Sequence, residues 1–204
     1  MMQKFISLNG LVAPSAGTVR FEGRDVTGLK PNRICRLGVG RTFQVVRTFA
    51  RMSVLENVLV GAYSAHGTEN AAWDGAREAV VRVGLERIAQ RAAGGLTNKE
   101  LRLLELARAL AGRPILLLMD EPLAGLGARE TDDIIALTQA LPAAGVTVMI
   151  IEHTMRAMVN TVDRFVVLDH GQLLMQGPPA EVTRDPRVVE AYLGRKWAAT
   201  YAAS

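Results

Sequence analysis

The sequence predicts an α/β fold built on an open parallel sheet with flanking helices. Short apolar runs alternate with helical patterns of about 10–15 residues between Ile115 and Leu168, which is the order typical of βαβ units. The run Ile115–Met119 is apolar throughout, as expected of a parallel strand that is covered on both faces. Hydrophobic residues make up 49% of the 204-residue chain, which is enough to bury a full core.

The first half of the chain predicts an antiparallel β segment followed by helices. Thr18–Phe21 alternates between polar and apolar residues, and glycines on either side mark turns. Ser53 and Glu56 have the spacing of a capping box, so a helical region, Ser53–Gly95, is expected to begin there. Apolar residues recur at i, i+3, i+4 and i+7 within Thr97–Gly112, and this period predicts a further helix.

The second half of the chain predicts strands and helices in alternation. This alternation would add parallel strands to the same sheet. The expected elements are helix Ala128–Leu141, strand Val146–Ile151, a helix from about Thr154, strand Arg164–Leu168, a hairpin turn Asp169–Gly171, strand Gln172–Gln176 and helix Glu181–Leu193.

Composition excludes several classes of protein. A single cysteine, Cys35, cannot form an internal disulfide and fits a reducing compartment. The longest apolar stretch, Val146–Ile151 with Thr147 allowed within it, is far shorter than the roughly 20 residues that a membrane-spanning helix needs. The net charge is +4, but the 24 basic residues are scattered and aromatics are only 5%, which does not favour a nucleic-acid groove. We therefore expect a cytosolic chain without a nucleic-acid partner.

Two predicted strands end in polar side chains. Ile115–Met119 runs into Asp120 and Glu121, and the strand that follows it runs into Glu152 and His153. Ligands of open α/β sheets bind at the carboxyl ends of the strands. There the first carboxylate suits Mg²⁺, and the second can polarise an attacking water as a general base. The alternative is that Asp120 or Glu121 caps the next helix, and that His153 is structural.

Five motifs follow one another along the chain: Arg41–Gln44, Leu96–Glu100 with the helix Leu101–Ala111, Asp120-Glu121, Leu123–Leu126 and Glu152-His153. Their order resembles that of the ATP-binding cassette (ABC) family of ATPases, in which they would be the Q-loop, the signature, Walker B, the D-loop and the H-loop. Four further segments resemble the ATP-binding subunit of branched-chain amino acid importers: Gly23–Gly28, Arg33–Gln44, Met52–Gly61 and Pro179–Gly194. The resemblance covers essentially the whole chain.

The resemblance implies roles for single residues. Gln44 would contact Mg²⁺ or its water and couple the nucleotide to the membrane subunits. Asp120 would bind Mg²⁺, and Glu121 would be the catalytic base. His153 would sense the γ-phosphate of ATP, and the hydroxyl of Thr97 in the signature would reach the nucleotide of a partner cassette.

The resemblance also implies the organisation and partners of the protein. The expected fold is a P-loop NTPase-like ABC core with a helical subdomain. Four segments are expected along the chain: residues 1–52, which end in the Q-loop; residues 53–112, with the helical subdomain and signature helix; residues 113–178, with Walker B, D-loop and H-loop; and a C-terminal tail, residues 179–204. The expected function is to hydrolyse ATP with Mg²⁺ and so power the import of branched-chain or related amino acids. The partners would be transmembrane permease subunits, a second identical or different cassette and, indirectly, a solute-binding protein. The chain would lie in the cytoplasm, peripheral to the inner face of the plasma membrane.

Three features depart from the family pattern. No string G-x-x-x-x-G-K-[ST], whose backbone amides and lysine bind phosphates, occurs in the sequence, which predicts a cassette truncated at its N-terminus. In the signature, Lys99 replaces a glycine that allows close backbone approach. Gly127 stands where the D-loop often has Asp or Asn.

These departures leave alternatives open. The chain could pair with a different cassette that completes one ATP site, or its signature could be in decay. It could also be a truncated, non-catalytic binding module. A DNA-repair or translation ATPase of the same superfamily would need a coiled-coil insertion or a tandem cassette, and the sequence has neither.

Overall fold

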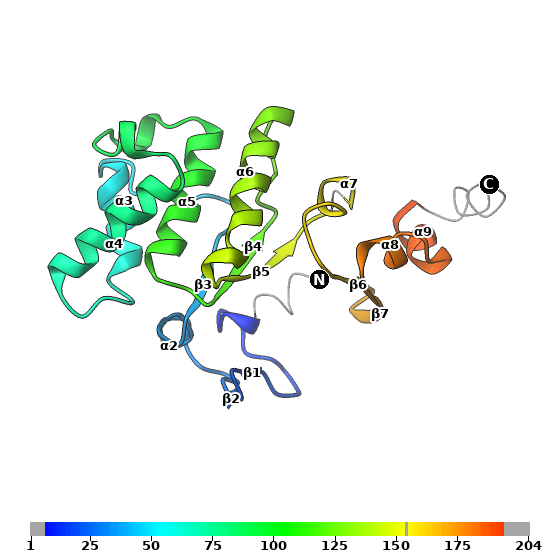
Figure 1. Cartoon of the computed structure of the whole chain (residues 1–204). Helices are drawn as coiled ribbons and strands as arrows, with labels where there is room; N and C mark the ends of the chain where they lie inside the picture. Colours follow the sequence, from blue (N-terminus) through cyan, green and yellow to red (C-terminus); the bar gives the residue numbers. More distant parts are fainter. Residues whose placement is uncertain (1–6, 154, 194–204) are drawn as a thin grey trace. The chain divides into compact units, whose positions relative to one another are not determined.

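The computed structural model describes residues 7–153 and 155–193, and the chain divides into two compact units, Met2–His153 and Thr154–Ser204. Each unit is described by itself. The first contains β1 (Arg20–Phe21), β2 (Arg24–Asp25), α2 (Pro31–Arg36), β3 (Val39–Arg41), α3 (Val54–Ala62), α4 (Glu69–Arg82), η1 (Glu86–Ile88), η2 (Ala93–Gly95), α5 (Asn98–Ala111), β4 (Leu116–Asp120), α6 (Ala128–Ala140), η3 (Pro142–Ala144) and β5 (Thr147–Ile151). The second contains α7 (Met155–Met158), β6 (Phe165–Asp169), β7 (Gln172–Gly177), α8 (Pro179–Val182) and α9 (Pro186–Leu193) (Figure 1).

The first unit is organised around a parallel sheet in the order β3-β4-β5. Its central strand, β4, is almost entirely buried, as its apolar sequence predicts. Arg41 pairs in register with Leu118, and Asp120 pairs with Ile151, so the carboxyl ends of all three strands meet at one edge. The short antiparallel pair β1-β2 confirms the β segment predicted near Thr18–Phe21.

Helices α3, α4 and α5 pack against one another and form the main hydrophobic core together with β4 (Figure 1). The predicted capping box of Ser53 with Glu56 begins α3, and a second box, Thr97 with Glu100, begins α5. In each box the serine or threonine oxygen and the glutamate carboxylate satisfy backbone N–H groups that have no partner within the helix. The caps therefore fix where these two helices begin, and burial of their apolar faces holds them together.

Gly61 marks the closest approach of α3 to α5. A Cβ atom at this position would overlap the backbone oxygen of Arg108 and lie 3.0 Å from the Cγ of the same residue. Because helix backbone cannot move as a flexible side chain can, a methyl group here has to push the two helices apart.

We expect Gly61→Ala to lower the free energy of unfolding by about 1–3 kcal/mol, because it overpacks the contact between α3 and α5. Gly67→Ala is the matched control, since Gly67 is exposed and a Cβ there would meet nothing within 4 Å. Urea unfolding of the wild type and both variants measures the difference. Equal stability of the two variants would show that α3 and α5 do not need this close approach.

The second unit differs from the prediction in two places. The strand predicted over Arg164–Leu168 is present as β6, but it pairs with β7 in a two-stranded antiparallel sheet and is not a further parallel strand among the described residues. The hairpin turn predicted at Asp169–Gly171 is confirmed, since β6 pairs antiparallel with β7 and the positive φ of His170 and Gly171 suits a tight turn. The helix predicted over Glu181–Leu193 is two helices, because Pro186 disfavours helical backbone at the residue before it.

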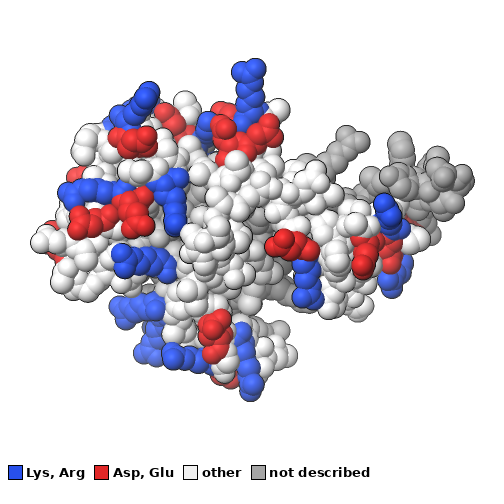
Figure 2. Space-filling view, viewed as in Figure 1, with Lys and Arg blue, Asp and Glu red and all other residues white. Residues whose placement is uncertain are grey.

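Parts of two predictions lie outside the described residues. They are Thr154, where the predicted helix begins, and the end of the tail, residues 194–204. The division into four segments stays a prediction. None of the described helices is long and apolar enough to cross a membrane. On the face drawn in Figure 2, acidic and basic side chains are interspersed, in keeping with the scattered charge of the sequence.

Candidate functional site

An ion pair joins the carboxyl ends of β3 and β4. The Arg41 Nη2 lies 3.1 Å from the Asp120 Oδ2, and the two side chains are only 10% and 6% exposed. The parallel register places both residues at the same edge of the sheet. The sequence predicts a metal site at Asp120 and gives Arg41 no role beyond its place in the segment Arg41–Gln44. The signal in the sequence for this ion pair is that Val39–Arg41 ends in a basic residue, as Leu116–Asp120 ends in an acidic one.

Glu121 follows Asp120 in a backbone conformation that is rare for residues other than glycine. Its φ is +46°, and its N–H donates to the Ile151 oxygen at 2.9 Å. Strained backbone of this kind clusters at functional sites, where it aims a side chain. The Glu121 Oε2 accepts a hydrogen bond from the Gln44 Nε2 at 2.8 Å, and the His153 Nδ1 lies 3.9 Å from the Glu121 Oε1. The structure thus brings together three predicted residues from three different loops.

Glu152 supports the loop that follows Glu121. Its side chain is 2% exposed, and its Oε1 accepts a hydrogen bond from the Leu123 N–H at 3.1 Å. Neither Asp120 nor Glu121 caps the next helix, because the N–H of Gly127 at the start of α6 donates to Glu130 at 2.9 Å. The helix-capping alternative for Asp120 and Glu121 is therefore wrong.

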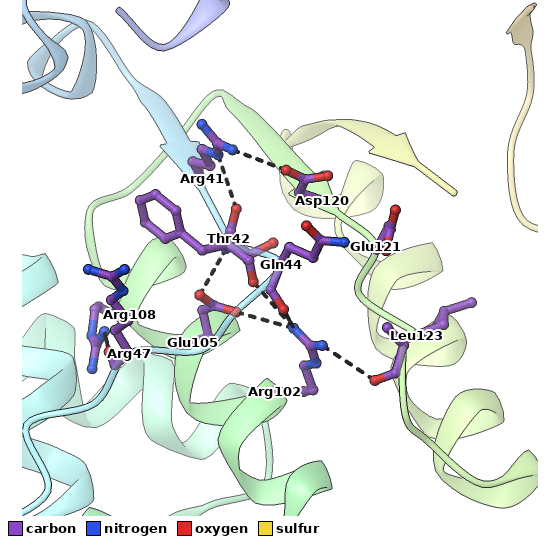
Figure 3. A network of polar contacts seen from close by, with 12 residues as sticks. Arg41, Thr42, Gln44, Arg47, Arg102, Glu105, Arg108, Asp120, Glu121 and Leu123 are labelled. Carbon is purple, nitrogen blue, oxygen red and sulfur yellow. Dashed lines mark hydrogen bonds and ion pairs between the residues drawn. The ribbon is translucent and has the colours of Figure 1, made fainter. Parts of the chain in front are cut away.

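Helix α5 binds the backbone of the loop that carries Gln44 (Figure 3). The Glu105 Oε1 accepts a hydrogen bond from the Phe43 N–H at 2.8 Å, and the Arg102 Nη1 donates to the Phe43 and Gln44 oxygens at 3.2 and 3.0 Å. The Arg102 Nη2 donates to the Ala124 oxygen at 3.3 Å. The sequence gives no sign of these contacts, since Arg102 and Glu105 are simply polar positions on an amphipathic helix.

A second set of hydrogen bonds holds the far end of this loop. The buried side chain of Asn57 binds the N–H and the oxygen of Phe49 at 2.9 and 3.1 Å. Arg108 donates to the Arg47 oxygen at 2.8 Å and to the Asn57 Oδ1 at 2.7 Å. The loop from Phe43 to Phe49 is therefore attached to α3 and α5 at both ends.

Glu105 is a buried carboxyl group among arginines. Burial raises its pKa from the usual 4.5 to about 7, although the Phe43 N–H and the guanidinium groups of Arg102, Arg108 and Arg41 lower it. Its folded-state pKa thus lies above that of the unfolded chain. The folded protein keeps a proton on Glu105 that the unfolded chain releases between about pH 4.5 and 7.

We therefore expect the contribution of Glu105 to stability to be fully present below about pH 4.5 and to be lost as the pH rises through 7. The loss is about 3 kcal/mol, since each pKa unit corresponds to about 1.4 kcal/mol. Glu105→Gln should remove this part of the pH dependence, because the amide does not titrate. Unfolding free energies from pH 4.5 to 8 measure it, and an unchanged slope in the variant would contradict the assignment.

The signature segment uses its polar groups within the chain. Thr97 is exposed, and its hydroxyl and N–H both bond to Glu100 in the capping box of α5. The Asn98 Nδ2 donates to the Gly125 oxygen at 3.2 Å, and Lys99 forms an ion pair with Asp133 of α6. The predicted role of Thr97 at a partner's nucleotide stays a prediction.

Comparison with known proteins identifies the family. The family model described as ABC transporter matches residues 5–124, more than half of the chain. The chain belongs to the ABC transporter family. A second family model, described as branched-chain amino acid ATP-binding cassette transporter, matches residues 172–198 of this ABC ATPase.

Two curated relatives of the ATPase match along most of its length. It is 37% identical to the high-affinity branched-chain amino acid transport ATP-binding protein BraF of Pseudomonas aeruginosa, over 93% of this chain and 81% of BraF. It is 34% identical to the corresponding protein LivG of Escherichia coli K12, with the same coverage. Among solved structures, a nucleotide-free ATP-binding cassette from an ABC transporter has a TM-score of 0.84 at 30% identity, over 95% of this chain and 83% of that one.

These comparisons confirm the predicted family, the ABC ATPase fold and the class of enzyme. The proposed roles of Gln44, Asp120, Glu121, His153 and Thr97 are not tested by them. Among residues 7–153 and 155–193, no three His, Cys, Asp or Glu side chains converge as a metal cluster. The carboxylate of Asp120 and the amide oxygen of Gln44 still fit Mg²⁺, because this ion binds one or two protein oxygens and takes its other ligands from water and phosphates.

Proposed function

We propose that this ABC ATPase is the ATP-hydrolysing subunit of an importer for branched-chain or related amino acids. The observation that carries the catalytic part is the 2.8 Å hydrogen bond between the Gln44 Nε2 and the Glu121 Oε2. It joins the loop held by α3 and α5 to the carboxylate that follows the buried strand β4. The relatives named for branched-chain amino acid transport and the match at residues 172–198 support the choice of solute.

The residues at the carboxyl edge of the sheet have separate roles in ATP hydrolysis. Asp120 and Gln44 would hold Mg²⁺, which supplies positive charge to the phosphates when it is bound. Glu121 takes a proton from the attacking water, and Gln44 keeps the carboxylate oriented through its hydrogen bond. The His153 Nδ1 lies 3.9 Å from the Glu121 Oε1, and the His153 side chain is 70% exposed, so it can contact the γ-phosphate of ATP.

The surface of the Gln44 loop supports a membrane-protein partner. Phe43, Val45 and Phe49 are 48%, 70% and 50% exposed, and Val60 and Tyr63 of the neighbouring helical region are also exposed. Exposed apolar side chains on one loop are typical of a protein-protein contact. We assign this loop to the transmembrane permease. A second cassette would complete the ATPase, a solute-binding protein would act only through the permease, and the chain would lie at the inner face of the plasma membrane.

The test uses the complex isolated from its source cell, because the 204 residues contain no G-x-x-x-x-G-K-[ST] string. Permease, ATPase and partner cassette are reconstituted in vesicles with the solute-binding protein, and ATP-dependent uptake of leucine is measured. We expect uptake that requires ATP and is competed by isoleucine and valine. A chain that assembles with the permease while the complex hydrolyses no ATP would support the non-catalytic module instead. Uptake of an unrelated solute alone would contradict the choice of substrate.

A further inference from the structure

Two charged side chains of α5 hold both backbone groups of Phe43, the residue before Gln44. The Glu105 Oε1 accepts a hydrogen bond from the Phe43 N–H at 2.8 Å, and the Arg102 Nη1 donates a hydrogen bond to the Phe43 oxygen at 3.2 Å. The same guanidinium group donates to the Gln44 oxygen and, through its second nitrogen, to the Ala124 oxygen in the loop after β4 (Figure 3). One arginine therefore ties together the loops that carry Gln44 and Glu121.

These contacts are sheltered from water and pair opposite charges. The Arg102 Nη1 lies 3.9 Å from the Glu105 Oε2, and the side chains are 12% and 5% exposed. Hydrogen bonds to charged groups in such surroundings are stronger than those at the surface. Gln44 is itself exposed, so little packing surrounds it. The position of its amide against Glu121 then depends on the backbone bonds to α5.

We infer that Arg102 and Glu105 are positioning residues, which hold the Gln44 loop so that the Gln44 amide stays against Glu121. The inference rests on the proposed roles of Gln44 and Glu121 in ATP hydrolysis. It means that α5, the helix that begins at the signature segment, sets the backbone position of Phe43 and Gln44. A displacement of α5 would be transmitted to the catalytic carboxylate through two side chains.

The first experiment measures hydrogen-deuterium exchange of peptides covering residues 43–49 in the full chain. Glu105→Leu removes the acceptor of the Phe43 N–H, and Arg102→Met removes three donated hydrogen bonds. Each variant should exchange at least about tenfold faster in this segment, as expected from the loss of a buried hydrogen bond to a charged group. Glu78→Gln, on the exposed face of α4, is the control and should exchange as the wild type does.

Glu105→Gln separates positioning from a general loss of structure. Its amide oxygen still accepts the Phe43 N–H, so protection of residues 43–49 should return close to that of the wild type. The charged groups that face Glu105 are Arg41, Arg102 and Arg108, so Glu105→Gln removes the negative charge among them while it keeps the acceptor of the Phe43 N–H.

The assembled transporter provides the functional test. Glu105→Leu should lower kcat and leave the KM for ATP unchanged, whereas Glu105→Gln should retain most of the activity. Wild-type exchange of residues 43–49 in Glu105→Leu and Arg102→Met, with α5 still protected, would overturn the inference. If the exchange results are as expected but the wild-type complex hydrolyses no ATP, the loop attachment stands and the proposed function fails.

Discussion

Replacing Glu121 with glutamine lowers the rate of ATP hydrolysis by about 10²–10⁴-fold, the usual contribution of a general base. Glutamine has the same shape, and its Oε1 can still accept the hydrogen bond from the Gln44 Nε2. The substitution therefore removes the proton acceptor while it keeps the contact between the two loops. The measurement is steady-state phosphate release by the transporter complex, with the variant chain in place of the wild type.

A matched control distinguishes the loss of the base from a loss of negative charge. Asp132→Asn on α6 removes an exposed carboxylate whose side chain forms none of the ion pairs described here, and it should leave hydrolysis unchanged. Binding of ATP should also be similar in the wild type and in Glu121→Gln, because the proposed defect lies in the chemical step. Hydrolysis by Glu121→Gln at the wild-type rate would show that another group activates the water.

The sequence predicts those parts of the structure that depend on neighbouring residues. The capping boxes at Ser53 and Thr97 are present because each needs only two side chains three residues apart. The apolar run before Asp120 is a buried parallel strand, as its composition indicates. Since parallel strands share their carboxyl edge, the meeting of Glu121 with His153 also follows from the order of strands along the chain.

The contacts that attach the Gln44 loop to α5 could not be predicted in this way. Phe43 and Glu105 are 62 residues apart, and Arg41 and Asp120 are 79 residues apart. An arginine or a glutamate on an amphipathic helix gives no local signal that it is buried, because the same residue types cover solvated faces. The register of the sheet and the packing of α5 decide which of them are buried, and both depend on the fold as a whole.

Arg41→Met lowers the free energy of unfolding by about 3–5 kcal/mol, because it leaves Asp120 as a buried carboxylate without its cation. The two side chains are 10% and 6% exposed, so water cannot replace the lost partner. Methionine keeps the length of the aliphatic stem, which limits the loss of packing. Urea unfolding at pH 7.5 measures the change.

The surface ion pair between Arg77 and Asp74 is the matched control. Its nitrogen and oxygen are 2.9 Å apart, close to the 3.1 Å of the Arg41–Asp120 pair, but its side chains are 61% and 77% exposed. Arg77→Met should cost only about 0–1 kcal/mol, because water solvates the remaining carboxylate. The comparison isolates burial as the cause of the larger effect.

The double variant Arg41→Met, Asp120→Leu tests the cause directly. If the cost of Arg41→Met is the desolvated charge of Asp120, removal of that charge should restore most of the lost stability, because a buried ion pair can be replaced by apolar side chains at little cost. If the double variant is as unstable as Arg41→Met, the arginine stabilises the sheet through its other contacts, the hydrogen bond to the Thr42 oxygen and the stacking on Phe43. In the first case Arg41 is the counter-ion of Asp120, so a cation that binds this carboxylate competes with a partner already present in the fold.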